Sequence, residues 1–312
     1  QFMLPFQMYF KLRPSLGKTT IDGIIWYSPS IFLWPLILLL KWHFKVKAYL
    51  ILRDIFPEWA FETQVIRSKL LYFALKKYAQ IQYRVADYIG IQATANASYI
   101  PTKFKHKVHL LENWLSDLEQ RKASYNFQDP QMAKKNIILY AGNVGIAQGF
   151  HRVLNLAEQL KYRDDIIFAC FSRGSELEAI RSEIKARNIK NIHFFDVIDQ
   201  ARLAAVCSQC VAGIVALDPR HLTHNIPGKF IMYLRSALPI IALVNENNQL
   251  IEIIENNRVG VVLRKSDEAH WHNLVTNFLS KSVSTSAISN NCVILFKNRY
   301  QSGAAVKTIV SK

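Results

Sequence analysis

The sequence predicts an α/β protein with two domains, each a parallel sheet covered on both faces by helices. Three observations support this fold class. Short apolar runs recur along the chain without alternation, which is typical of strands buried on both faces. Between them lie amphipathic stretches that are long enough for helices. The 312 residues, of which 50% are hydrophobic, suffice for about two folded domains.

The first domain is expected at residues 1–115. A strand that contains Trp26 and Tyr27 ends at a Ser-Pro-Ser turn, and the next strand ends at Arg53 and Asp54. A basic, amphipathic helix pattern follows. This repetition of strand and helix predicts a parallel sheet. The strands are expected at 22–27, 47–52, 88–92 and 108–111, and the basic helix is expected at 68–86.

A second domain is expected at residues 136–282, after a polar linker at 116–135. Its regular alternation predicts a complete doubly wound domain, whose ligand should bind at the carboxyl ends of the strands. A tail at 283–312 is expected to pack back on the first domain. The strands are expected at 136–140, 165–171, 192–195, 213–217, 239–244 and 260–263, and the helices at 150–160, 175–187, 200–208, 228–236 and 250–256.

The chain carries an excess of positive charge. Its 39 Lys and Arg against 23 Asp and Glu give a net charge of +16. Such an excess suits an anionic membrane surface or a phosphorylated substrate. A nucleic acid is not an expected partner, because the basic residues are scattered and the sequence contains no nucleic-acid-binding motif.

Two cysteines, Cys207 and Cys210, form a lone CxxC motif. A zinc ribbon needs a second pair of ligands at comparable spacing, which the sequence lacks. Because the motif lies in an apolar stretch, we expect both residues to pack as small hydrophobic side chains in a reducing compartment.

An apolar segment at 31–40 is followed by Trp42 and several lysines. Ten residues cannot cross about 30 Å of hydrocarbon as a helix. The segment therefore predicts either a buried helix or a helix that also touches the bilayer. No signal peptide is visible, but the N-terminus is expected to be missing. The chain is expected in the cytoplasm, at the periphery of the inner membrane.

A glycine-containing turn follows the first strand of the second domain. It holds Gly142, Asn143, Gly145 and Gln148. Glycines allow the backbone to approach a phosphate, and the helix that follows offers free N–H groups. The turn is neither a GxGxxG nor a Walker A sequence. An ordinary connection between strand and helix is therefore the alternative.

Another polar turn follows the next strand and opens a helix. Arg173 could contact a phosphate there, and the backbone at Gly174 could frame a base. The alternative is a simple connection in which Ser175 caps the helix.

A third polar stretch lies between a buried strand and a helix. Its Arg220 and Lys229 could neutralise a diphosphate. His221 and His224 suggest a metal, but no third histidine lies near them, so no metal site is expected. The stretch is too polar for an ordinary connector, which favours a function.

Charged residues also end a strand of the first domain. Arg53, Asp54 and Glu58 are expected to point into a crevice, and structural pairing among them is the alternative. Asn113 ends the last strand of this domain and is expected to face the same cleft.

The order of these motifs resembles that of family 4 glycosyltransferases of the GT-B fold, which have two Rossmann-like domains. The likeness is greatest to bacterial fucosamine-transferase-like enzymes of O-antigen and capsule assembly. Three segments carry it: RDIFPEW at 53–59, YAGNVGIAQG at 140–149 and NIPGKFIMYLRSALPIIA at 225–242.

The resemblance implies a retaining transfer of a sugar from a nucleoside diphosphate, expected to be UDP, without a metal or other cofactor. The acceptor would be a polyprenyl-diphosphate-linked sugar or a polysaccharide in lipopolysaccharide or capsule synthesis, reached at the anionic inner leaflet. The family's N-terminal glycine-rich loop has no counterpart here. The chain is therefore expected to be N-terminally truncated, with an incomplete first domain.

The reaction implied by the resemblance assigns roles to individual residues. Cleaving a sugar–phosphate bond builds charge on the leaving diphosphate, so cations and N–H donors should surround it. Catalytic roles are expected for Arg220, Lys229, Asp54 and Glu58. Donor binding is expected for Gly142, Asn143, Gly145, Gln148, Arg173, Gly174, His221, Asn225, Gly228 and Tyr233, and acceptor or cleft positions for Tyr27, Arg53 and Asn113.

Three positions depart from the family's pattern. Its E-x7-E pair, whose second member holds the donor ribose, falls on His224 and Met232. Gln148 stands where a phosphate-binding lysine is common, and a histidine that commonly closes the strand at Tyr27 is missing.

Two other functions remain open. A nucleotide-sugar 2-epimerase shares the fold, but it needs acid–base carboxylates and histidines, and its glutamate-rich segments are missing. A truncated or degenerate protein would bind polyanions or a membrane without catalysis.

Overall fold

The computed structural model describes residues 3–17, 20–28, 30–116, 123–280 and 282–312. The chain forms two compact units. The first comprises Gln1–Asn113, Thr223–Asn225 and Ala305–Lys312, and the second comprises Trp114–Leu222 and Ile226–Ala304. The expected linker at 116–135 lies outside the described residues at 117–122.

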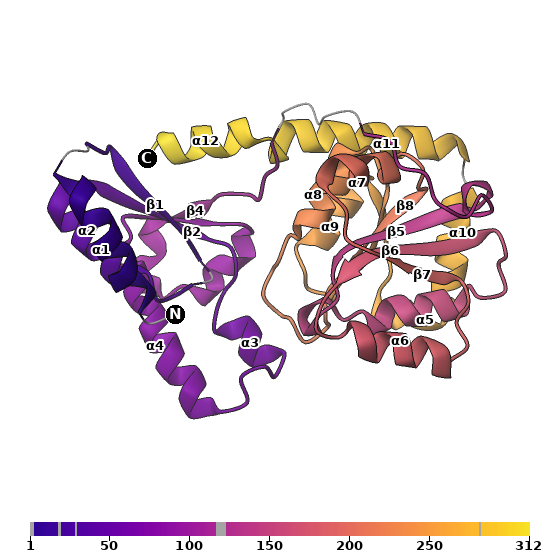
Figure 1. Cartoon of the computed structure of the whole chain (residues 1–312), viewed down its shortest axis with the longest axis horizontal. Coiled ribbons are helices and arrows are strands. Elements are labelled where there is room, and N and C mark those ends of the chain that lie inside the picture. Colours follow the sequence, from indigo (N-terminus) through magenta and orange to yellow (C-terminus); the bar gives the residue numbers. More distant parts are fainter. Residues whose placement is uncertain (1–2, 18–19, 29, 117–122, 281) are drawn as a thin grey trace. The chain divides into compact units, whose positions relative to one another are not determined.

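The first unit contains a four-stranded parallel sheet in the order β1-β2-β3-β4 (Figure 1). All four strands correspond to expected strands. Their bounds are Gly23–Ser28 for β1, Lys47–Leu52 for β2, Tyr88–Ile91 for β3 and Val108–Leu110 for β4. The helices of this unit are α1 (Leu4–Leu16), α2 (Trp34–Phe44), α3 (Glu58–Glu62) and α4 (Lys69–Val85), with 3₁₀ turns at Thr94–Tyr99 and Thr102–Lys107.

Helix α4 is the basic helix that the sequence predicts. It begins after Ser68, whose hydroxyl accepts a hydrogen bond from the Leu71 N–H at 3.3 Å and so satisfies one of the free amides of the first turn. Its buried face packs Tyr83 and Val85 into a core with Leu50, Leu52 and Ile89 of the sheet.

Helix α2 contains most of the apolar segment at 31–40, and it is only partly buried. Leu36 and Ile37 are buried, whereas Leu38, Leu39 and Trp42 are exposed. The segment therefore forms a helix that is buried on one side and exposed on the other. Among the residues that the structure describes, no helix is both long and apolar enough to cross a membrane.

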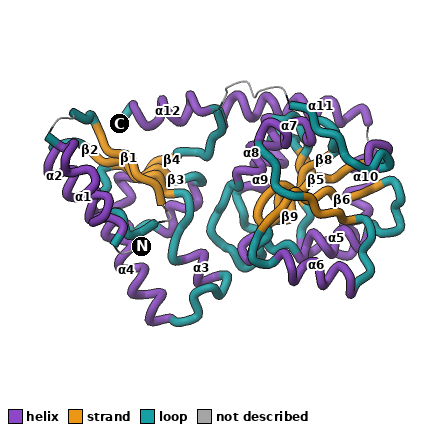
Figure 2. Tube along the Cα trace, viewed as in Figure 1, coloured by secondary structure: helices purple, strands orange, loops and turns teal. Residues whose placement is uncertain are grey.

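The second unit is a doubly wound domain around a six-stranded parallel sheet in the order β10-β9-β8-β5-β6-β7 (Figures 1 and 2). The sheet grows outward from β5 in both directions, through β6 on one side and β8 on the other. The strands are β5 (Asn136–Asn143), β6 (Ile166–Arg173), β7 (Ile192–Phe195), β8 (Ala212–Ala216), β9 (Ile240–Leu243) and β10 (Gly260–Val262).

Helices cover both faces of this sheet, as expected for buried parallel strands. They are α5 (His151–Gln159), α6 (Leu177–Ala186), α7 (Gln200–Cys207), α8 (Gly228–Arg235), α9 (Leu250–Asn256), α10 (Trp271–Ser280) and α11 (Ser282–Leu295). A π-helical turn at Phe296–Tyr300 leads to α12 (Ser302–Val310), which enters the first unit at Ala305. Shorter 3₁₀ turns occur at Met132–Lys134, Ile146–Gln148 and Lys265–His270.

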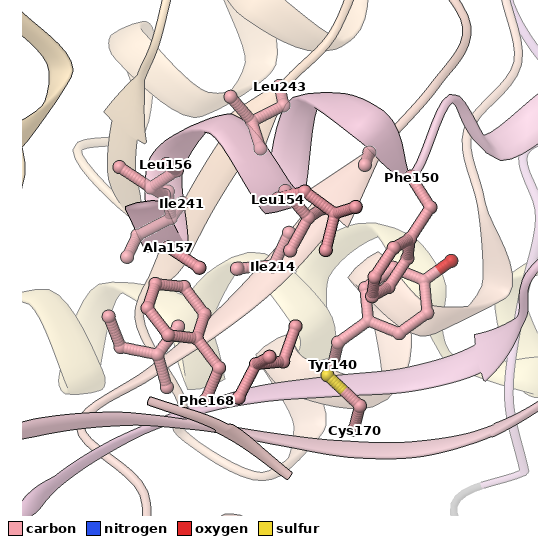
Figure 3. Packing of buried hydrophobic residues seen from close by; sticks show 14 of the residues in the cluster. Tyr140, Phe150, Leu154, Leu156, Ala157, Phe168, Cys170, Ile214, Ile241 and Leu243 are labelled. Atoms are coloured by element: carbon pink, nitrogen blue, oxygen red, sulfur yellow. The ribbon is translucent and has the colours of Figure 1, made fainter. Parts of the chain in front are cut away.

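The core of the second unit is continuous and apolar (Figure 3). The rings of Tyr140 and Phe150 meet edge to face at 4.8 Å, next to Cys170. Cys207 is also buried, Cys210 is half-buried, and burial raises the pKa of both thiols. This environment agrees with the expectation that the CxxC motif packs as small hydrophobic side chains.

Candidate functional site

A pocket of about 480 Å³ opens at the carboxyl edge of the second sheet. Its wall combines the ends of β5 and β6, the segment after β7, and one face of α8. This is the position at which doubly wound domains bind ligands, because the strand order reverses beside β5. The described residues that line it are Leu115, Ala141, Gly142, Asn143, Phe171, Arg173, Val197, Ile198, Gln200, Leu203, Gly228, Lys229, Met232 and Arg235.

The glycine-containing turn supplies one wall of the pocket. Gly142 has a φ of +140°, and a Cβ at this position would meet Lys229 Cε at 3.3 Å. Gln148 braces the turn from behind, because its Oε1 accepts from Gly145 N–H and from Asn143 Nδ2, each at 3.1 Å. Gln148 therefore holds the shape of the turn from outside the pocket lining.

The turn after β6 packs closely against the backbone of the glycine-containing turn. Gly174 has a φ of +152°, and a Cβ there would lie only 2.1 Å from the Val144 carbonyl oxygen. Only glycine allows this approach. The close contact places Arg173, which lines the pocket, next to the end of β5.

Lys229 lies in the first turn of α8, two residues after the N-cap residue Pro227. Its Nζ is buried, has no hydrogen-bond partner, and lies 3.8 Å from the centre of the Tyr140 ring. Burial lowers the pKa of this amine from 10.5 to about 7. A buried cation without an anionic partner is costly, so the site is poised to receive an anion.

Part of the pocket lining is apolar and aromatic. It includes Phe171, Val197, Ile198 and Leu203, and the ring of Phe171 stacks on that of Phe195 with ring centres 4.9 Å apart. Such a surface suits a planar base. The sequence analysis missed these residues, along with Gln200 and Arg235, because only their spatial grouping distinguishes them from other core-edge side chains.

Other expected donor residues lie around the pocket in supporting positions. Tyr233 is fully buried beneath β5, where its hydroxyl accepts from the Ala141 N–H at 2.9 Å. Arg220 is half-exposed and makes a two-pronged ion pair with Asp218, at 2.9 and 2.8 Å. Burial lowers the pKa of His221 to about 4, so this imidazole is neutral at physiological pH.

Two residues of the same stretch cluster with the first unit. The Asn225 Oδ1 accepts a hydrogen bond from Gln92 Nε2 at 3.2 Å. The backbone of His224 exchanges two hydrogen bonds with the side chain of Asn96, at 2.8 and 2.9 Å. Among the described residues, no group of three or more His, Cys, Asp or Glu side chains could hold a metal ion.

The polar residues expected in the first unit gather at the carboxyl ends of β1 and β2. Tyr27, Arg53 and Asp54 lie close enough for their charges to affect one another's pKa values. Burial lowers the pKa of Arg53 to about 10 and raises the pKa of Asp54. Glu58 pairs instead with Lys76 of α4 at 3.2 Å. Asn113 follows the end of β4.

Comparisons with known proteins come from sequence and from structure. No protein-family model matches the chain. A Pseudomonas aeruginosa protein named as the probable glycosyltransferase WbjE is 21% identical over 262 residues, which cover 82% of this chain. The chain spans 64% of the length of that curated relative.

Several solved structures share the fold. Anabaena HepE, solved with UDP and glucose, has a TM-score of 0.71 at 12% identity, over 97% of this chain and 82% of its own. Sucrose-phosphate synthase from Thermosynechococcus elongatus has a TM-score of 0.75 at 13% identity, over 99% of this chain and 77% of its own. The UDP-forming trehalose-phosphate synthase of Burkholderia vietnamiensis reaches 0.70 at 12% identity, over 99% and 74%. The chain therefore has the GT-B fold, which confirms the fold class that the sequence predicts.

Proposed function

We propose that this chain is a retaining glycosyltransferase that takes a sugar from a nucleoside diphosphate donor. The observation that carries the proposal is the buried amine of Lys229, which has no hydrogen-bond partner and lines a pocket at the carboxyl edge of the sheet. The glycine-containing turn and the amino end of α8 meet at the same point. The named relative is a probable glycosyltransferase, and HepE was solved with UDP-glucose.

The pocket offers the groups that the leaving diphosphate requires. Charge grows on the phosphate oxygens as the sugar bond breaks, and preorganised cations and N–H donors stabilise that charge. Lys229 and Arg173 supply cations, and the backbone at Gly142 supplies close approach. Arg220, oriented by Asp218, is the candidate for a further cation.

The described side chains of the pocket agree with a retaining reaction that uses no enzyme carboxylate as a nucleophile. Its described lining residues include no carboxylate, and hence no carboxylate pair like that of retaining hydrolases. In our proposal the acceptor attacks from the side of the leaving group. The departing phosphate oxygen takes the proton of the acceptor hydroxyl. The oxygen of that hydroxyl forms the new glycosidic bond.

The acceptor would bind at the first unit. We propose that Asp54, whose pKa is raised by burial, orients the acceptor hydroxyl, with Arg53 and Tyr27 beside it. Glu58 and Asn113 stay candidates for the same role. An acceptor carried on a lipid diphosphate, used for O-antigen or capsule synthesis, would match the basic character of the chain.

A surface of the first unit supports binding to an anionic membrane from the cytoplasmic side. Helices α1 and α2 pack against each other, and they expose Phe6, Phe10, Leu38 and Trp42. Lys11 and Arg13 are exposed on α1, and Lys45 is exposed directly after the end of α2. Apolar side chains with flanking cations are the composition that lies flat in a headgroup region.

A co-sedimentation experiment tests the membrane proposal. The chain should pellet with vesicles that contain anionic phospholipid and remain in solution with purely zwitterionic vesicles. The double variant Phe10→Glu/Trp42→Glu should lose this binding, whereas Tyr162→Glu, an exposed aromatic of the second unit, should retain it. Equal pelleting of both variants would contradict the proposal.

Calorimetric titration with UDP-glucose tests the donor proposal. Wild-type protein should bind it, and Lys229→Met should abolish measurable binding. The matched control is Lys190→Met, because Lys190 is an exposed lysine of the same unit. Retained binding in Lys229→Met would overturn the assigned site. Vesicle binding without any heat from nucleotides would favour the alternative of a non-catalytic protein that binds anionic surfaces.

A further inference from the structure

A second pocket, of about 270 Å³, lies among the segments that follow β8, β9 and β10, beside the first turn of α5. It lies wholly within the second unit, and it has no described lining residue in common with the donor pocket. It is therefore a separate cavity. Its described lining residues are Arg152, Pro219, Leu222, Val244, Asn245, Glu246, Asn247 and Lys265.

The turn after β9 leaves two buried hydrogen-bonding atoms open. Asn245, which is 7% exposed, donates its Nδ2 to the His221 carbonyl at 3.0 Å, but its Oδ1 has no partner among the described residues. Asn248, which is 2% exposed, donates its backbone N–H to the Asn245 carbonyl at 3.0 Å. Its Nδ2 likewise has no partner in the described part of the chain. Because buried polar atoms are rarely left unpaired, an open acceptor and an open donor in one turn indicate a partner from outside the chain.

Arg152 supplies further donors, which the fold holds in a fixed position. Its Nη1 donates to the Val244 carbonyl at 3.1 Å, and its Nη2 donates to the Leu263 carbonyl at 3.3 Å. The guanidinium also lies 5.3 Å from the centre of the Trp271 ring. A guanidinium carries five N–H groups, so these two contacts leave donors for a ligand.

The composition of this wall suits a sugar ring. Arg152 and Lys265 are accompanied by the carboxylate of Glu246, so the pocket offers both donors and acceptors and not a single sign of charge. Pro219 and Leu222 add apolar surface. A hydroxyl group both donates and accepts hydrogen bonds, so the hydroxyls of one ring can pair with both kinds of atom. The volume lies just below the range of about 300–1,000 Å³ that is typical of small-molecule sites, which suits one ring.

We propose that the second pocket binds one neutral pyranose ring of a saccharide. A ring hydroxyl donates to Asn245 Oδ1, another accepts from Arg152, and the C–H groups of the ring pack on Pro219 and Leu222. Binding here requires no nucleotide, so the proposal goes beyond the donor site and does not depend on it. A glycan anchored in this pocket is held by the second unit and leaves the donor pocket free.

Saturation-transfer NMR of the full chain tests the proposal. The neutral probes are the methyl glycosides of glucose, galactose, mannose and N-acetylglucosamine, and methyl glucuronide is the charged probe. At least one neutral glycoside should bind with a dissociation constant of about 1 mM, and added UDP-glucose should leave this binding unchanged. The proposal would be overturned by binding of no neutral glycoside at about 10 mM, by binding of the glucuronide alone, or by displacement of the glycoside by UDP-glucose.

Two variants locate the binding within the second unit. Leu222→Trp fills the pocket from an exposed position, and Asn245→Leu removes the open acceptor while keeping a similar size. Both should weaken glycoside binding by about tenfold or more. The control is Tyr162→Trp, at an exposed position of the same unit outside the pocket, which should bind as wild type does.

Thermal denaturation checks that the variants fold. If Asn245→Leu unfolds because it also loses the bond to the His221 carbonyl, Leu222→Trp decides alone. Unchanged glycoside binding in a folded Leu222→Trp protein would refute the second pocket as the site. Titration of the same proteins with UDP reports on the proposed function separately, because neither variant changes a residue that lines the donor pocket.

Discussion

Replacing Lys229 with methionine removes a charge from a position where the fold provides no partner for it. The Nζ is buried, and the contact that stabilises it is the Tyr140 ring at 3.8 Å. Burial lowers the pKa of the amine from 10.5 to about 7. At neutral pH the amine is therefore fully protonated in the unfolded chain but only partly protonated in the folded protein.

The size of this cost follows from proton linkage. Each pH unit between the unfolded and folded pKa corresponds to about 1.4 kcal/mol, so the amine costs the fold about 4 kcal/mol at pH 7 as an upper limit. Because the folded pKa is the lower one, the cost is greatest at and below pH 7. It fades as the pH rises toward 10.5 and is about 1 kcal/mol at pH 10.

Urea unfolding of Lys229→Met at pH 7 and pH 10 measures this cost. Methionine is unbranched and similar in length, so it fills the same space without a charge. The variant should be more stable than wild type by about 2–4 kcal/mol at pH 7, with the gap nearly closed at pH 10. Lys190→Met should show no such gap at either pH. A less stable Lys229→Met protein at pH 7, or a gap that does not shrink with pH, would refute the reasoning.

Three further predictions follow from the same contacts. Affinity for UDP-glucose should fall by up to about tenfold per pH unit above pH 7, because the neutral amine of Lys229 must take up a proton to pair with the diphosphate. Calorimetric titration from pH 6.5 to 9 measures this dependence. The affinity of Lys229→Arg should depend less on pH. Gly174→Ala should destabilise the fold by about 3 kcal/mol or more, because the added Cβ would lie 2.1 Å from the Val144 carbonyl oxygen. Urea unfolding measures this loss of stability. The control is Gly303→Ala, which should cost no stability because its Cβ would meet no atom within 4 Å. Gln148→Ala should weaken nucleotide binding by about tenfold while costing about 1 kcal/mol of stability, because the turn loses two hydrogen bonds that hold its shape. Calorimetry measures the binding, and urea unfolding measures the stability. A large loss of stability would contradict the role of Gln148 in shaping the turn.

Local pattern along the chain was enough to predict the strands and the helices α2 and α4 to α9, but not α3 or α10 to α12. Buried apolar runs predicted β5 and β6 near their observed positions, and the helix expected at 250–256 is α9, Leu250–Asn256. These signals are local because a strand buried on both faces must be apolar throughout. Helix α1 was not predicted, since its apolar residues remain largely exposed and show no helical period of burial.

The sequence by itself also determined the glycine-containing turn and the basic stretch before α8, because the residue types that bind phosphate are few and recognisable. Only the tertiary structure decided which of these residues meet. Lys229 and Arg173 share a pocket because β5 lies between β6 and β8, an order that no local pattern encodes. Tyr233 lies beneath β5 because of packing at long range, since its hydroxyl meets the Ala141 N–H, 92 residues earlier in the chain. The protonation of Lys229 likewise depends on the depth at which the fold buries its amine, and that depth is a property of the assembled domain and not of the segment.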